Sequence, residues 1–234
     1  MKKNINDISP RQAASAAGFG LLLMVVLAPI AYFSVLQNLI VSGDAQATVT
    51  NITNALGSFR ISIVLLLIVA ILDIIVSWGL YVLLKPINKS LALLTAWFRV
   101  VYAAIFAVAI ANLYHVLPIL EGAAYADMLG ADQLNAQVML LVESYRIEWD
   151  TGLAVFGLHL SILGYLVFKS GPRILGVLVV LAGIGYSVDS FGKMLIPDYS
   201  LTISLYTFAG EILLIVWLLW IGFRGVPDTL KRAK

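Results

Sequence analysis

The chain has 234 residues, of which 61% are hydrophobic and 12% charged, and its mean hydropathy is +0.97. Soluble domains are about half apolar and about a quarter charged, so this composition excludes an ordinary soluble fold. The net charge of +2 comes from short basic clusters between apolar runs, which argues against nucleic-acid binding, and the absence of cysteine excludes disulfides and thiolate chemistry.

Six apolar stretches are long enough to cross a bilayer, for which a helix needs about 20 residues. In chain order we predict spans at 13–41, 60–84, 90–117, 150–168, 172–195 and 204–223. The first is interpreted as an uncleaved span, because a signal peptide has an apolar region of only about 7 to 15 residues. A cleavable signal ending at 45–47 is the alternative. The predicted fold class is all-α, with residues 1–234 as a single integral membrane domain of about six transmembrane helices.

The basic residues predict the orientation through the positive-inside rule. With the N-terminus in the cytoplasm, only Arg60, Arg146 and Lys193 fall outside, and Arg99 falls within a span. The residues then inside are Lys2, Lys3, Arg11, Lys85, Lys89, Lys169, Arg173, Arg224, Lys231, Arg232 and Lys234. Both termini are therefore predicted to be cytoplasmic.

Two segments between spans are predicted to form short helices at the outer surface. Asp44 followed by 45–52 is typical of an N-capped helix, and 132–148 reads as a second, semi-polar one. Both are expected to lie on the membrane surface or to cap the bundle. Ordinary connectors with a few helical turns are the alternative.

Four ionisable residues fall near the middle of four predicted spans. A charged side chain there costs about 2.5 to 3.5 kcal/mol, so it needs a partner. At about 1.5 Å per residue from the inner turns, Asp73 and Glu211 lie about 18 Å deep. Arg99 and His159 lie about 15 Å deep. We predict a mainly structural Asp73–Arg99 pair, which leaves His159 and Glu211 to share a proton, to hydrogen-bond, or to hold a cation or polar headgroup.

Three further polar residues extend this intramembrane seam. Tyr102 follows Arg99 by three positions, and Asp189, about 24 Å from the inner turn, has Tyr186 three residues before it and Lys193 four after it. The group around Asp189 is either a local Asp189–Lys193 pair or the mouth of a ligand path. The predicted ligand-binding residues are Asp73, Arg99, Tyr102, His159, Tyr186, Asp189 and Glu211.

Motifs for nucleotide, hydrolase and metal chemistry are missing from the sequence. Gly192-Lys193 is followed by Met194 and lacks the glycine spacing of a phosphate loop, and neither G-x-S-x-G nor H-E-x-x-H occurs. His115 and His159 are expected about 24 Å apart along the bilayer normal, too far to share a metal or haem. We predict no catalytic residue, metal or cofactor, and the sequence leans against enzymatic activity.

Several motifs together resemble a known family. They lie at 81–92, 98–99, 156–159, 164–165, 172–176 and 189–190. The combination is similar to the bacterial membrane family catalogued as domain of unknown function 4386, and it covers nearly the whole chain. The resemblance implies a multi-pass protein of six helices in the bacterial cytoplasmic membrane and brings no activity. Arg99, His159 and Asp189 coincide with polar landmarks of that family.

Three functions are the main hypotheses at this point, and an intramembrane hydrolase is a fourth possibility for which the sequence marks no nucleophile. The leading hypothesis is the binding or sensing of a small amphiphilic or lipid-like ligand at the polar seam. The second is a proton-coupled small-molecule transporter in which Glu211 and His159 take up the proton, small for that role unless it forms a homodimer. The third is a non-enzymatic accessory protein of a membrane complex, with the buried charges as internal struts. The expected partners are the lipid bilayer, such a ligand, and a second copy or a membrane protein.

Overall fold

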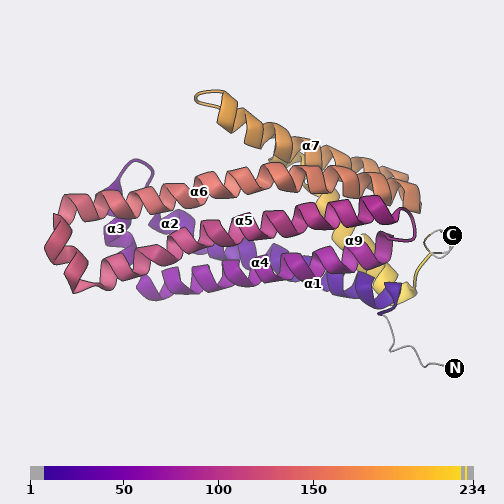
Figure 1. Cartoon of the computed structure of the whole chain (residues 1–234), viewed down its shortest axis with the longest axis horizontal. Helices are drawn as coiled ribbons and strands as arrows, with labels where there is room; N and C mark the ends of the chain where they lie inside the picture. Colours follow the sequence, from indigo (N-terminus) through magenta and orange to yellow (C-terminus); the bar gives the residue numbers. More distant parts are fainter. Residues whose placement is uncertain (1–7, 228–229, 231–234) are drawn as a thin grey trace. The chain divides into compact units, whose positions relative to one another are not determined.

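The computed structural model describes residues 8–227 and 230, and for 123–129 the backbone alone. Over that part of the chain the regular structure is entirely helical (Figure 1). The elements are α1 (Pro10–Ala31), the π-helical η1 (Tyr32–Leu36), α2 (Gln37–Leu39), α3 (Ala45–Asn54), α4 (Leu56–Leu84), α5 (Lys89–Glu121), α6 (Ala123–Ser170), α7 (Arg173–Leu195), α8 (Ile203–Thr207) and α9 (Ala209–Arg224).

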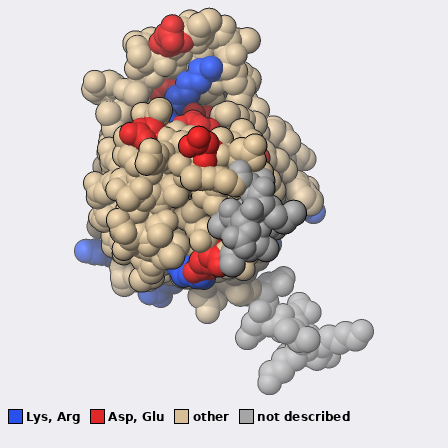
Figure 2. Space-filling view, turned by 90° about the vertical axis from the view of Figure 1, so that its left-hand side faces the viewer, with Lys and Arg blue, Asp and Glu red and all other residues tan. Residues whose placement is uncertain are grey.

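Six described segments are long and apolar enough to cross a membrane, which confirms the predicted fold class. They are Pro10–Leu39, Leu56–Leu84, Lys89–Glu121, Gly130–Ser170, Arg173–Leu195 and Ile203–Arg224. Large apolar side chains are exposed along them, as lipid contact requires, and Figure 2 shows charged side chains as small separate groups on a mostly uncharged surface. The chain is therefore a multi-pass membrane protein. The cytoplasmic location of its termini stays a prediction.

The two expected outer helices have different outcomes. The first is present as α3, and the Asp44 carboxylate accepts a hydrogen bond from the Ala47 amide at 2.8 Å, as an N-cap does. The second is not separate, because 132–148 continues into the fourth span within α6. Between Gly130, which has a φ of 69°, and Gly152 the chain has neither glycine nor proline to interrupt the helix.

The chain divides into two compact units, which are described separately. The first comprises Met1–Leu22, Leu72–Ala103 and Thr151–Lys234, and the second Leu23–Ile71 and Ala104–Asp150. In the second unit, Tyr145 stacks on Trp149 with ring centroids 5.9 Å apart, and the Asn112 amide donates to the Glu148 carboxylate at 2.7 Å. All seven residues of the predicted seam belong to the first unit.

Close approach between helices holds the first unit together. A Cβ on Gly183 of α7 would lie 2.5 Å from the Gly157 carbonyl oxygen of α6, so only glycine permits this contact. Near the start of α1, the Arg11 guanidinium donates to the carbonyls of Gly222 and Phe223, at 2.8 and 3.1 Å, and so satisfies the C-terminal end of α9. These contacts join α6 to α7 and α1 to α9, and so hold three of the helices that carry the polar residues.

Candidate functional site

A buried ion pair lies at the centre of the first unit. The Nη2 atom of Arg99 on α5 is 2.6 Å from Oδ1 of Asp73 on α4, and the two side chains are 1% and 0% exposed. The Ser77 hydroxyl ties the same two helices by donating to the Ala96 carbonyl at 2.8 Å. The predicted Asp73–Arg99 pair is confirmed.

His159 of α6 braces Arg99 from a third helix. Its Nε2 lies 3.2 Å from Arg99 Nη1, and its Nδ1 lies 2.8 Å from the Thr95 carbonyl oxygen. Because a guanidinium can only donate, Nε2 carries the lone pair and Nδ1 carries the hydrogen, which it donates to Thr95. These bonds assign a neutral imidazole. The Phe156 ring, which stacks on His159, has the Arg99 guanidinium 5.3 Å from its centroid.

Glu211 enters the cluster from the first turn of α9. Glu211 is half-buried, and its carboxyl lies near the Tyr186 hydroxyl of α7 and within electrostatic range of Arg99 and Asp73. Of the alternatives predicted for His159 and Glu211, a direct hydrogen bond is not made, since both ring nitrogens of His159 already have partners. Joint binding of a cation or a polar headgroup stays a prediction.

An aromatic layer joins the remaining seam residues. Phe156 of α6 lies between Tyr102 of α5 and Tyr186 of α7, with ring centroids 4.8 and 5.5 Å apart. The structure therefore brings Tyr102 and Tyr186 to the cluster, as predicted. Thr95 and Phe156 were missed. Thr95 is four residues before Arg99, and Phe156 three before His159, so helical spacing could have identified both.

Asp189 has a separate role, at the end of α7. Its carboxylate accepts hydrogen bonds from the Tyr199 hydroxyl at 3.0 Å, the Ile203 amide at 2.9 Å, and the amide and hydroxyl of Ser204 at 2.7 and 2.6 Å. Two of these donors are backbone amides of the first turn of α8, which lack partners within the helix. Asp189 thus fastens the 196–202 connection to α7, and neither predicted interpretation described this.

Replacing Asp189 by asparagine should loosen that connection. The amide nitrogen cannot accept the bonds that one carboxylate oxygen accepts, and bonds to charged groups contribute about 1.5 to 3 kcal/mol each. We expect amide hydrogen exchange over 199–207 to accelerate at least tenfold, measured by mass spectrometry. Asp198→Asn in the same exposed connection is the matched control and should leave exchange unchanged. Equal exchange in both variants would refute the fastening role.

The cluster has hydrogen-bonding capacity that the described residues leave unused. Although Asp73 touches Arg99, neither of its oxygens has a partner with hydrogen-bond geometry, and Arg99 Nε has none. No described group of three or more His, Asp or Glu side chains could hold a metal ion. Buried polar atoms without partners are rare, and three of the five among the described residues belong to this centre, which makes it the strongest candidate for function.

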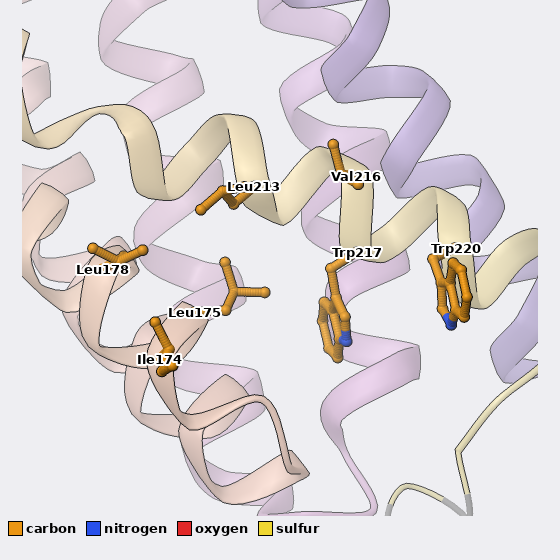
Figure 3. Close-up of a pocket in the computed structure, with 7 residues that line it drawn as sticks. All are labelled: Ile174, Leu175, Leu178, Leu213, Val216, Trp217 and Trp220. Atoms are coloured by element: carbon orange, nitrogen blue, oxygen red, sulfur yellow. The ribbon is translucent and has the colours of Figure 1, made fainter.

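Two grooves open on the surface of the first unit, and residues of the cluster line neither. The larger, about 410 Å³, runs between α7 and α9 (Figure 3). Its lining is almost entirely apolar: Ile174, Leu175, Leu178, Leu213, Val216, Trp217 and Trp220. The second, about 330 Å³, lies between α6 and α7. A ligand in either groove would therefore not touch Asp73 or Arg99.

Comparisons with known proteins agree with the resemblance seen in the sequence. The family described as Domain of unknown function (DUF4386) matches residues 16–222. A protein of Archaeoglobus fulgidus, described as uncharacterized, is 36% identical over 159 residues, which are 67% of this chain and 81% of that protein. No solved structure matches. Since this relative is archaeal, the bacterial cytoplasmic membrane stays a prediction.

Proposed function

We propose a function for this chain, which belongs to the family described as Domain of unknown function (DUF4386). The buried cluster binds one exchangeable proton, and the protein is a proton-coupled transporter of a small molecule. The observation that carries this proposal is the composition of the cluster. The cluster contains two carboxyls, on Asp73 and Glu211, but only one guanidinium, on Arg99, to balance their charge.

The charge count favours a single proton. The hydrogen bonds of His159 assign a neutral ring, so two ionised carboxyls, on the fully buried Asp73 and the half-buried Glu211, would leave the cluster with a net negative charge. An uncompensated buried charge costs several kcal/mol, and protonating one carboxyl removes it. Asp73 is in direct contact with Arg99, which favours its ionised form. The proton therefore rests on Glu211, beside the Tyr186 hydroxyl.

Burial favours a proton over a larger ligand. Asp73, Arg99 and His159 are at most 1% exposed, so an amphiphile headgroup could reach them only if the helices moved apart. A proton needs no such space. The same contacts would also stabilise an accessory protein in which the buried charges have only a structural role. A transporter and such an accessory protein differ in whether the proton exchanges with bulk water.

Infrared difference spectroscopy between acid and alkaline buffers tests the exchangeable proton directly. We expect the reconstituted protein to give a protonated-carboxyl band that shifts in heavy water and disappears in Glu211→Gln. Glutamine resembles the protonated acid, so this variant should fold. Glu148→Gln, which removes a carboxyl of the second unit, is the control and should keep the band. No such band in the native protein, or an unchanged band in Glu211→Gln, would refute the proposal.

Coupling is tested by hydrogen exchange over 203–224 at several pH values. We expect the ratio of the exchange rates of the native protein and Glu211→Gln to change with pH as the cluster gains or loses its proton. The intrinsic pH dependence of amide exchange is the same in both proteins and cancels in this ratio. Identical exchange at every pH would leave the cluster as a strut and would refute proton coupling.

A further inference from the structure

The groove between α6 and α7 combines an apolar floor with a charged end, and this feature is independent of the proton site. Its lining is Tyr165, Phe168 and Lys169 from α6, with Gly176, Val177, Val180 and Leu181 from α7. Lys169 is its only charged lining residue. We call it the basic groove.

Two cations are held over the aromatic wall of the basic groove. Lys169 Nζ is 5.6 Å from the centroid of the Tyr165 ring, and the Arg173 guanidinium carbon is 5.8 Å from that of Phe168. The two rings are three residues apart on α6, so they are neighbours on its surface. Cation–π attraction keeps both charges beside the groove. Among the described residues, neither cation has an acidic partner.

The rest of the basic groove suits a hydrocarbon chain. Gly176 lets α7 approach α6 closely at the floor of the groove, since a Cβ there would lie 2.5 Å from the Phe168 amide nitrogen. Farther along α7 the wall is aliphatic, and Val177 and Leu181 are 47% and 45% exposed. A lipid tail is as apolar as these side chains and can lie against them.

We infer that the basic groove binds an anionic phospholipid, with its phosphate between Lys169 and Arg173 and one acyl chain along Val177 and Val180. Basic pockets between transmembrane helices are known to select anionic headgroups. Two other places in the first unit each lack one part of this combination. The α7–α9 groove has one cation at its end, Arg224 over Trp220 at 4.9 Å, and the turn at 85–89 has two lysines but lines neither groove.

Native mass spectrometry of the full chain tests the inference, with phosphatidylglycerol and phosphatidylcholine of identical acyl chains as probes. The native protein should retain phosphatidylglycerol preferentially. At about fivefold per cation, Lys169→Gln with Arg173→Gln should reduce that preference about 25-fold. Lys85→Gln with Lys89→Gln removes the same charge at the other turn and should preserve it.

A second variant tests the acyl chain. Val177→Phe, on the lipid-facing wall, should fill the groove and lower phosphatidylglycerol retention while the thermal unfolding midpoint stays unchanged. Unchanged retention would refute a seated chain. Equal losses in the two double variants would show attraction to basic charge in general, and no preference in the native protein would show an ordinary boundary lipid; either result overturns the inference.

Discussion

Replacing Arg99 by methionine is expected to lower the free energy of unfolding by about 3 to 5 kcal/mol, the cost of leaving a buried charge without its partner. Asp73 would remain at 0% exposure with no cation beside it, and His159 would lose the donor to its Nε2. Reversible unfolding in mixed micelles measures the change. Arg146→Met is the control. Arg146 is half exposed and pairs with Glu143 at 3.4 Å, so its loss should cost at most about 1 kcal/mol.

A double-mutant cycle separates the ion pair from the packing of Arg99. Asp73→Leu combined with Arg99→Met replaces both charges by apolar groups, an exchange that is often neutral or stabilising when a buried pair is replaced as a whole. We expect the double variant to be more stable than Arg99→Met alone, with a coupling energy of about 0.5 to 3 kcal/mol. Strictly additive losses would show that Asp73 and Arg99 do not interact in the folded protein.

The Asp73–Arg99 pair could be predicted because a tight turn fixes the relative height of two consecutive helices. Hydropathy locates six spans, and counting from the turn at 85–89 places the two residues at similar depth. The partners of His159 and Glu211 could not be predicted in the same way. Depth says nothing about how each helix is rotated, and rotation decides which side chains meet.

Two other differences have related physical causes. Hydropathy identifies the part of a helix that lies in hydrocarbon, not where the helix begins, so α6 starts well before its predicted span at 150–168. The hydrogen bonds of Asp189 come from a connection that folds back on α7, and no sequence periodicity describes such a return. Spacing on a helix is thus readable from the sequence, whereas contacts made through irregular segments are not.

Gly183→Ala is expected to lower the free energy of unfolding by about 1 to 3 kcal/mol, the usual cost of overpacking. The added Cβ would lie 2.5 Å from the Gly157 carbonyl oxygen and 2.7 Å from the Ser161 amide nitrogen, which are backbone atoms of α6 that cannot turn aside. In a helix alanine is more stable than glycine by about 0.5 to 1 kcal/mol. The expected loss of stability therefore comes from the clash and would outweigh the higher helix propensity of alanine. Gly57→Ala in α4, where the new Cβ would meet nothing within 4 Å beyond the backbone of its own helix, is the matched control and should be neutral or stabilising.

The same substitution links packing to the polar cluster. His159 follows Gly157 by two residues and Tyr186 follows Gly183 by three, so separation of α6 from α7 should move Tyr186 away from the residues that hold Arg99. We expect the Glu211-dependent infrared band to shift in Gly183→Ala and to stay in place in Gly57→Ala. A destabilised Gly183→Ala with an unshifted band would mean that the surroundings of Glu211 do not depend on the spacing of α6 and α7. In that case the α6–α7 contact would contribute stability without tuning the site.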